Sequence, residues 1–297
     1  MKVLFHSLFI LLFVFTACTS TPKQATIDYT QYVNPFIGTD FTGNTYPGAQ
    51  VPFGMVQLSP DNGLPGWDRI SGYFYPDTTI AGFSHTHLSG TGAGDLYDIS
   101  FMPVTRPYKE APAPLGIYST FSHNEEAASA GYYRVLLQDY NINVELTATE
   151  RCGIQRYTFP KAEDAGFILD LDYSIQRQKN EQMELEVISD TEIRGRKKTV
   201  YWAFDQYINF YAKFSKPFTY TLVTDSVALD ADGPLLPTAK LLLQFQTGKD
   251  EQVLVKVGVS AVDMDGARKN VEAEIPGWDF DGVRRAARQQ WNTYLSK

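Results

Sequence analysis

Apolar and polar residues alternate in short runs through the middle of the chain, from residue 131 to residue 262. In the run 154–159, Ile, Arg and Thr alternate with Gln, Tyr and Phe, which predicts a strand with one wet and one aromatic face. Similar runs of strand length are 133–137, 142–147, 166–171, 183–188, 191–195, 201–214, 218–223, 239–245 and 252–259. Turn signals at Ser189-Asp190, Asp232-Gly233 and Gly248-Lys249 separate several of them. Because almost no helical periodicity lies between these runs, the pattern predicts an all-β fold, an antiparallel β-sandwich.

The part of the chain before this region, residues 29–107, is rich in Gly, Pro, Asn, Asp and aromatic residues. Turn signals such as Tyr46-Pro47-Gly48 and Pro65-Gly66 recur in it, and the apolar bursts 55–58 and 99–102 have strand length. We expect a loop-rich β surface that carries a site.

Helical periodicity enters only near the end of the chain. A short helix is predicted from Asp265-Gly266 to residue 274, and a second over 280–295, with Asp279 as its cap and apolar residues at spacings of three and four. Trp291 and Tyr294 on this apolar stripe need a surface to pack against. That surface is either the sandwich itself or a further part of the protein, and the lack of a terminator before Lys297 favours the second. The predicted domains are therefore a sandwich at 29–262 and linker helices at 263–297.

The first residues have the pattern of a targeting segment. Lys2 precedes an apolar run at 3–15 that is too short to span a bilayer, so residues 1–18 are predicted to be a signal peptide. Because small residues lead into Cys18, we expect lipidation of this cysteine; cleavage of an ordinary signal peptide nearby is the alternative. Residues 19–28 form a polar tether. The prediction is a cell-envelope lipoprotein of the outer membrane or periplasm, held to the membrane by a lipid anchor.

Composition narrows the remaining possibilities. The chain has 297 residues, two cysteines and a formal net charge of −8. If Cys18 carries lipid, Cys152 has no partner for an intrachain disulfide, so the core alone must hold the domain together. The acidic balance argues against nucleic acid as a partner, whereas a neutral ligand remains possible.

The stretch 82–95 is the strongest candidate for a binding site. His85 and His87 are two residues apart and point to the same face of an extended segment, and Ser89 begins a run of small residues and glycines. Glycine lets a ligand come close to the backbone, and the imidazoles, hydroxyls and backbone amides of this stretch can bond hydroxyl groups, so the stretch suits a polyhydroxy ligand. A structural corner, in which the histidines bond neighbouring carbonyls, is the alternative.

Residues for catalysis or metal binding are not apparent. Asp95 and Asp98 would point to opposite faces of a strand, and Asp61 and Asp68 lie in turn sequences, where Asp bonds its own backbone. No third possible ligand follows the two histidines at a spacing typical of metal-binding motifs, so no metal-binding residue is assigned.

Aromatic residues are a better guide. Trp67 lies in a turn, where a flat apolar ring can stack on a sugar, whereas Trp202, Phe204 and Phe210 are expected in the core.

Several blocks of the chain resemble the N-terminal domain of glycoside hydrolase family 92. They include residues 44–49, 52–61, 82–92, 121–123, 131–135, 267–270 and 274–280, and the likeness runs from about Tyr32 to the end. The family consists of exo-acting α-mannosidases, many from gut Bacteroidetes. The resemblance implies a β-sandwich joined through helices to a C-terminal α/α toroid, with the active site between them.

The resemblance also implies the chemistry. Family members depend on calcium, bound mainly by the C-terminal domain, and invert anomeric configuration with two carboxylates of that domain, so no catalytic residue is assigned in this chain. The expected function is the substrate-pocket domain of an α-mannosidase acting on mannose-containing glycans, α-1,2-linked N-glycan mannose among them. A non-catalytic glycan-binding lipoprotein is the alternative. Residues carried over as substrate-binding are Gly43, Asn44, Trp67, His85, His87, Ser89 and Asp95.

Overall fold

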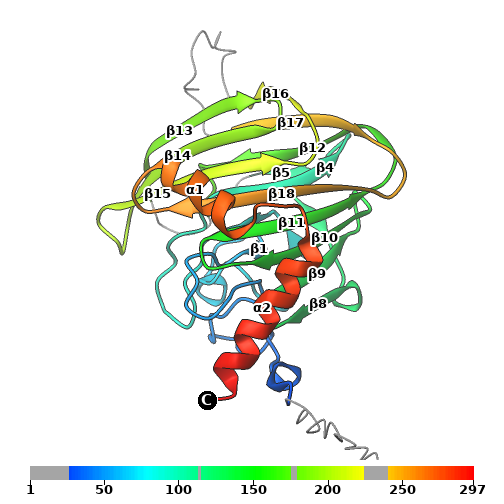
Figure 1. The fold of residues 1–297 in the computed structure, drawn as a ribbon. Helices are drawn as coiled ribbons and strands as arrows, with labels where there is room; N and C mark the ends of the chain where they lie inside the picture. The colour runs from blue at the N-terminus through cyan, green and yellow to red at the C-terminus, as the bar shows by residue number, and fades with distance from the viewer. Residues whose placement is uncertain (1–26, 113–114, 175–178, 224–239) are drawn as a thin grey trace, which may run out of the picture.

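Two antiparallel sheets face each other in the computed structural model, which describes residues 27–112, 115–174, 179–223 and 240–297 (Figure 1). This arrangement confirms the predicted fold class, a β-sandwich followed by the start of a helical segment. The signal peptide with Cys18, the tether up to residue 26 and the turn expected at Asp232-Gly233 lie outside the described residues.

The larger sheet has eight strands, and each pairs antiparallel with its neighbours. Its order is β13 (Lys179–Ser189), β14 (Glu192–Val200), β15 (Gln206–Phe214), β18 (Glu251–Ser260), β11 (Cys152–Phe159), β10 (Ile142–Ala148), β9 (Tyr132–Leu137) and β8 (Glu126–Ser129). The sequence pattern had predicted part of each of these strands except β8.

The smaller sheet has six strands, in the order β1 (Ser59–Asp61), β3 (Gly82–Ser84), β4 (Ser100–Thr105), β12 (Ala162–Asp170), β17 (Lys240–Thr247) and β16 (Thr219–Leu222). A register shift between Ala162 and Ala165 makes a β-bulge in β12. The remaining short elements are η1 (Tyr29–Tyr32), η2 (Trp67–Arg69), η3 (His123–Glu125) and the pairs β2 (Thr79–Ile80) with β7 (Ser119–Thr120) and β5 (Glu110–Ala111) with β6 (Gly116–Ile117).

The core between the sheets contains the aromatic face predicted for 154–159. Tyr157 and Phe159 are fully buried, and both pack against Phe167 of the facing sheet, with ring centroids 4.8 and 5.7 Å apart. The prediction of a wet opposite face is wrong at Ile154, which is also fully buried. It lies in a second apolar cluster on the outer surface of the larger sheet, covered by the two C-terminal helices.

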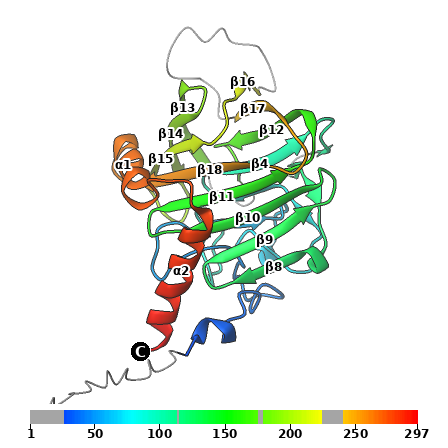
Figure 2. The ribbon, with the colours of Figure 1, turned by 45° about the vertical axis from the view of Figure 1, so that its right-hand side comes forward.

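The two helices have the caps that the sequence provides. Asp263 accepts from the backbone N–H of Gly266 at the start of α1 (Met264–Glu274), and Asp279 accepts from that of Gly282 at the start of α2 (Phe280–Leu295). The cap at Asp279 is confirmed; α1 begins one residue before the predicted start. In Figure 2, α1 lies beside β15 and β18, and α2 crosses β9, β10 and β11.

Helix α2 also docks at its C-terminal end. Trp291 is half-buried and donates from its indole nitrogen to the carbonyl oxygen of Gln50 at 2.7 Å, while the exposed ring of Tyr294 meets that of Phe53 edge-on. The sandwich loops therefore cover part of the apolar stripe. Phe53 (86% exposed) and Tyr294 (41%) leave an apolar surface open beside it.

Two local predictions were wrong. Residues 55–58 form no strand, because only an isolated bridge joins Ala49 to Leu58 before β1 begins. The run 201–214 becomes a strand only at residue 206. Its first part is a loop in which Trp202 and Phe204 are 62% and 85% exposed, not core residues, whereas Phe210 is fully buried as predicted.

Cys152 is a buried free thiol under the helices, and burial raises its pKa. None of the helices in the described part of the chain is long and apolar enough to cross a membrane.

Candidate functional site

A hollow of about 400 Å³ opens at one end of the sandwich. Three chain segments meet there: the loop after β1, the glycine-rich loop after β3 and the loop between β14 and β15. The residues that line it are Pro65, Gly66, Trp67, Ile70, Gly92, Gly94 and Tyr201. Its volume falls within the range of small-ligand sites, roughly 300–1,000 Å³.

Trp67 provides the largest apolar surface of this hollow. It begins η2 and is 61% exposed, so its indole is open to solvent, not packed in the core. The turn is held by Arg69, whose guanidinium forms two bonds to the Asp77 carboxylate, at 2.6 and 2.5 Å, and lies over the ring of Phe74. This partner raises the pKa of Arg69. A bidentate ion pair of this kind fixes geometry, so the exposed ring sits on a rigid turn.

The glycine-rich loop approaches Trp67 closely. A Cβ built on Gly92 would lie 3.0 Å from the Cη2 atom of the indole, which is closer than ordinary van der Waals contact. Gly90 has a φ of +66° and donates its backbone N–H to the carbonyl oxygen of Asn44 at 2.6 Å. Bare backbone at these positions lets the loop, the indole and a ligand approach one another.

Asp95 ties this loop to the next one. Its carboxylate is buried and accepts from the backbone N–H groups of Trp202 and Ala203, both at 3.2 Å, and of Leu96 at 2.9 Å. These bonds anchor the segment 201–205, which connects the paired strands β14 and β15, and Tyr201 of this segment lines the hollow. Sequence reasoning missed Tyr201, because the aromatic run suggested a continuous strand.

His87 does not line the hollow and is only 4% exposed. Its Nδ1 is 2.7 Å from the carbonyl oxygen of Gln57, which can only accept, so Nδ1 carries a proton. Its Nε2 is 2.8 Å from Oδ1 of Asp61 and 3.1 Å from the hydroxyl of Ser84. The expectation that Asp61 bonds its own backbone in a turn is wrong, since this carboxylate ends β1, is fully buried and pairs with His87.

His85 is fully buried. Its Nδ1 donates to the carbonyl oxygen of Ile99 at 2.7 Å, and its Nε2 lies 3.0 Å from the amide nitrogen of Gln155, which donates to it. Burial lowers the pKa of His85 to about 4, so the ring is neutral. Both histidines thus find partners inside the fold. Their contact with substrate hydroxyls stays a prediction.

The other predicted residues occupy different environments. Asn44 has a φ of +52° and is 6% exposed, and its Oδ1 has no partner among the described residues. Gly43 sits in a tight turn, where a Cβ would lie 2.3 Å from the carbonyl oxygen of Gly38. Ser89 is exposed at the start of the glycine run. Asn44 and Gly90 are directly bonded, so the structure brings these segments together.

A buried ion pair that no sequence pattern indicated lies behind the loop. Lys197 and Asp98 are both fully buried, with Nζ 3.2 Å from Oδ1. The other oxygen of Asp98 accepts from Thr86 and Gln206. Asp95 and Asp98 therefore have separate structural partners.

No group of three or more His, Cys, Asp or Glu side chains that could hold a metal ion occurs among the residues that the structure describes. The described residues therefore offer no carboxylate cluster for a calcium ion.

Comparisons with known proteins agree on one family. Residues 32–260 match the model of the glycosyl hydrolase family 92 N-terminal domain, and residues 266–297 match that of its catalytic domain. An alpha-mannosidase from Bacteroides thetaiotaomicron, solved in complex with mannoimidazole, superposes with a TM-score of 0.83 at 36% identity over 91% of this chain and 37% of that one. An inverting mannosidase from the same species gives 0.75 at 26%, over 91% and 36%.

A curated relative from the fungus Arthroderma benhamiae, an uncharacterized secreted glycosidase, is 27% identical over 90% of this chain. The chain spans only 38% of that relative's length.

Proposed function

The chain belongs to glycosyl hydrolase family 92, and on that premise we propose that it forms one wall of the substrate pocket of an exo-acting α-mannosidase. The rest of that pocket would come from the α/α toroid, whose family model matches this chain only at residues 266–297. The substrates are the mannose-containing glycans on which such enzymes act.

The observation that carries this proposal is the exposed indole of Trp67 over a hollow of polar backbone. A sugar ring has an apolar C–H face that stacks on an aromatic ring and hydroxyls that bond to amides and carbonyls. None of the side chains lining this hollow is charged. A neutral sugar therefore matches the hollow better than a phosphate or another ion does.

Trp67 would stack on the sugar of the leaving group. The buried amide oxygen of Asn44, which has no partner among the described residues, would accept from a hydroxyl. Gly43, Ser89, His85 and His87 would complete this side of the pocket, with Asp95 ordering the loop. Within the fold, the neutral imidazole of His85 and the Asp61-paired ring of His87 already have hydrogen-bond partners, so substrate contact by either would require the loop to rearrange.

The finer chemistry belongs to the same proposal. Inversion of configuration uses an acid and a base about 6.5–9.5 Å apart with water between them. We assign both carboxylates, and the calcium ion, to the catalytic domain, and derive no step through the metal. The preferred linkage would be α-1,2, as in N-glycan mannose.

The cellular location is proposed on two grounds. The apolar run before Cys18 has the pattern of a lipoprotein signal, and the fungal relative is described as secreted. We place the protein in the cell envelope, anchored by lipid on Cys18. Cys18→Ser should shift it from the membrane fraction or leave the signal uncleaved, and a processed variant that stays in the membrane would refute the anchor.

A glycan-binding lipoprotein without hydrolytic activity is the second candidate. The bond from Trp291 to Gln50 favours it, because the sandwich itself receives part of the apolar stripe of α2.

Kinetics separate these functions. In the enzyme that includes this chain and a complete catalytic domain, Trp67→Ala should lower kcat/KM for α-1,2-mannobiose more than for an aryl α-mannoside, whose leaving group needs no sugar platform. Equal losses of kcat/KM on both substrates would show that Trp67 does not contact the leaving group. Absence of mannose release by that enzyme would leave the binding protein as the function.

A further inference from the structure

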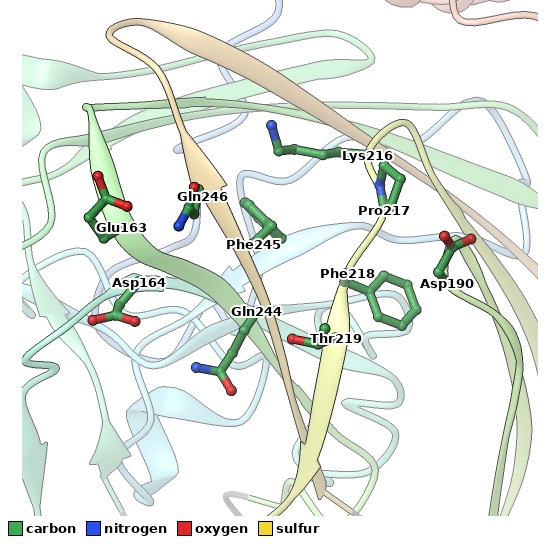
Figure 3. Close-up of a pocket in the computed structure, with 10 residues that line it drawn as sticks. All are labelled: Glu163, Asp164, Asp190, Lys216, Pro217, Phe218, Thr219, Gln244, Phe245 and Gln246. Atoms are coloured by element: carbon green, nitrogen blue, oxygen red, sulfur yellow. The ribbon is translucent and has the colours of Figure 1, made fainter.

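A second hollow, of about 700 Å³, lies at the other end of the sandwich (Figure 3). Asp190 at its edge lies in the turn that leads into β14, whereas Tyr201 of the Trp67 hollow directly follows β14. Nine residues of extended strand separate the two, which corresponds to roughly 30 Å. The second hollow is therefore not an extension of the first.

Hydrogen-bonding side chains line this hollow from three adjacent strands. Gln244 and Gln246 are two residues apart on β17 and therefore share one face, and Thr219 of β16 is directly paired with Gln244. Glu163 and Asp164 lie on β12 beside them, at the bulge between Ala162 and Ala165. Bulges re-aim side chains, and here the bulge brings two consecutive carboxylates to the rim of one hollow.

These groups are not used by the fold. The carboxylates of Glu163 and Asp164 and the amide of Gln246 are exposed and form no hydrogen bond or ion pair with another described residue. Gln244 accepts only a 3.4 Å bond from Thr221, which leaves its amide hydrogens free within the described chain. Donors and acceptors thus stand together at one rim.

The charges and apolar surface of the hollow restrict its ligand. Lys216 is already bound to Glu251, with Nζ 2.5 Å from Oε1, so the unpaired charges are carboxylates and an anionic ligand is disfavoured. Phe218 and Phe245 belong to the core and are only 6% and 8% exposed, so they offer too little surface for an apolar ligand. A lysine ammonium group would satisfy the carboxylates but has no acceptor for the amide hydrogens. Hydroxyl groups match both.

We propose that this second hollow, defined by Glu163, Asp164, Thr219, Gln244 and Gln246, is a carbohydrate-binding site that holds a neutral stretch of glycan away from the Trp67 hollow. Its identity as a mannan site rests on the proposed function; its identity as a carbohydrate site does not. A remote site of this kind keeps a polymeric substrate near the protein while chain ends are exchanged.

The test is binding of yeast α-mannan to the chain by affinity electrophoresis, with xylan and hexalysine as further probes. The double variant Gln244→Ala/Gln246→Ala should weaken mannan binding by about three- to tenfold. Gln182→Ala is the matched control, because Gln182 is also an exposed strand glutamine but lines neither hollow. Unchanged thermal unfolding of the double variant excludes a folding defect.

Three outcomes decide the matter. The second site is supported if the double variant loses mannan binding and the Trp67→Ala variant keeps the binding that depends on the two glutamines. A second outcome is that xylan binds through the two glutamines and mannan does not bind. This outcome supports the carbohydrate site and contradicts the mannan substrate of the proposed function. The proposal is overturned if the double variant binds both polysaccharides as strongly as the wild-type protein does, or if only hexalysine binds.

Discussion

The carboxylate of Asp95 accepts a hydrogen bond from the backbone N–H of Trp202, which lies 107 residues later in the chain. This bond and its neighbour at Ala203 join the glycine-rich loop to the β14–β15 loop. Two segments that both reach the Trp67 hollow are therefore fixed to each other by one buried side chain.

Asp95→Ala should destabilise the fold by about 2 kcal/mol, because it removes the acceptor of the part-buried N–H groups of Trp202 and Ala203. Asp95→Asn keeps one side-chain oxygen and should cost about 1 kcal/mol. Urea unfolding of both variants gives the comparison. Equal stability of the alanine variant and the wild-type protein would show that water replaces the carboxylate.

Gly92→Ala should weaken sugar binding without a large change in stability. Its new methyl group would lie 3.0 Å from the Trp67 indole and displace the ring, which is exposed and free to move outward. Gly277→Ala is the control, since no atom lies within 4 Å of the place where its Cβ would stand. An indole signal of Trp67 in NMR spectra that is the same in the variant and the wild-type protein would refute the steric argument.

Gly258→Ala should strongly destabilise the docking of α1. A Cβ at this position would meet the carbonyl oxygen of Ala267 at 2.4 Å, and backbone cannot swing aside as a side chain does. Overpacking of this kind costs typically 1–3 kcal/mol, and we expect about 3. Denaturant unfolding measures the loss, and a cost below about 1 kcal/mol would mean that the helix shifts freely.

Acid should destabilise the protein through His85. Because burial lowers the pKa of this ring to about 4 from an ordinary value near 6.5, the unfolded chain takes up the proton more readily between these values. The free energy of unfolding therefore falls as the pH drops from 6.5 towards 4, by up to about 3 kcal/mol.

Comparison with His85→Gln, which cannot titrate, isolates this contribution. The variant should lose less stability than the wild-type protein between pH 7 and pH 5. Parallel pH profiles for the two proteins would assign the acid sensitivity to other groups.

The sequence predicted the regular strands well, because alternation in runs such as 154–159 reflects a buried face directly. It failed where pairing with a neighbouring strand decides the local structure. Tyr201–Asp205 has the composition of a strand, yet it forms the hairpin loop between β14 and β15, and Asp95 of a distant loop anchors its backbone.

The candidate site was predicted in part. Trp67 is exposed on a hollow, as its position in a turn suggested, and the glycine run lies beside it. The histidine pair was a weaker guide, because its partners Asp61 and Gln155 are far away in sequence and visible only in the fold. Spacing alone cannot distinguish a buried imidazole from one facing a ligand.

The most direct test of the account is titration of the chain with α-1,2-mannobiose, followed through the indole N–H signals of its four tryptophans. The signal of Trp67 should shift saturably, and Trp67→Ala should weaken binding by about tenfold or more, while Trp202→Ala, an equally exposed tryptophan that does not line the hollow, should not. Saturable binding that leaves the Trp67 signal unmoved and survives Trp67→Ala would contradict the assignment of this hollow to the substrate.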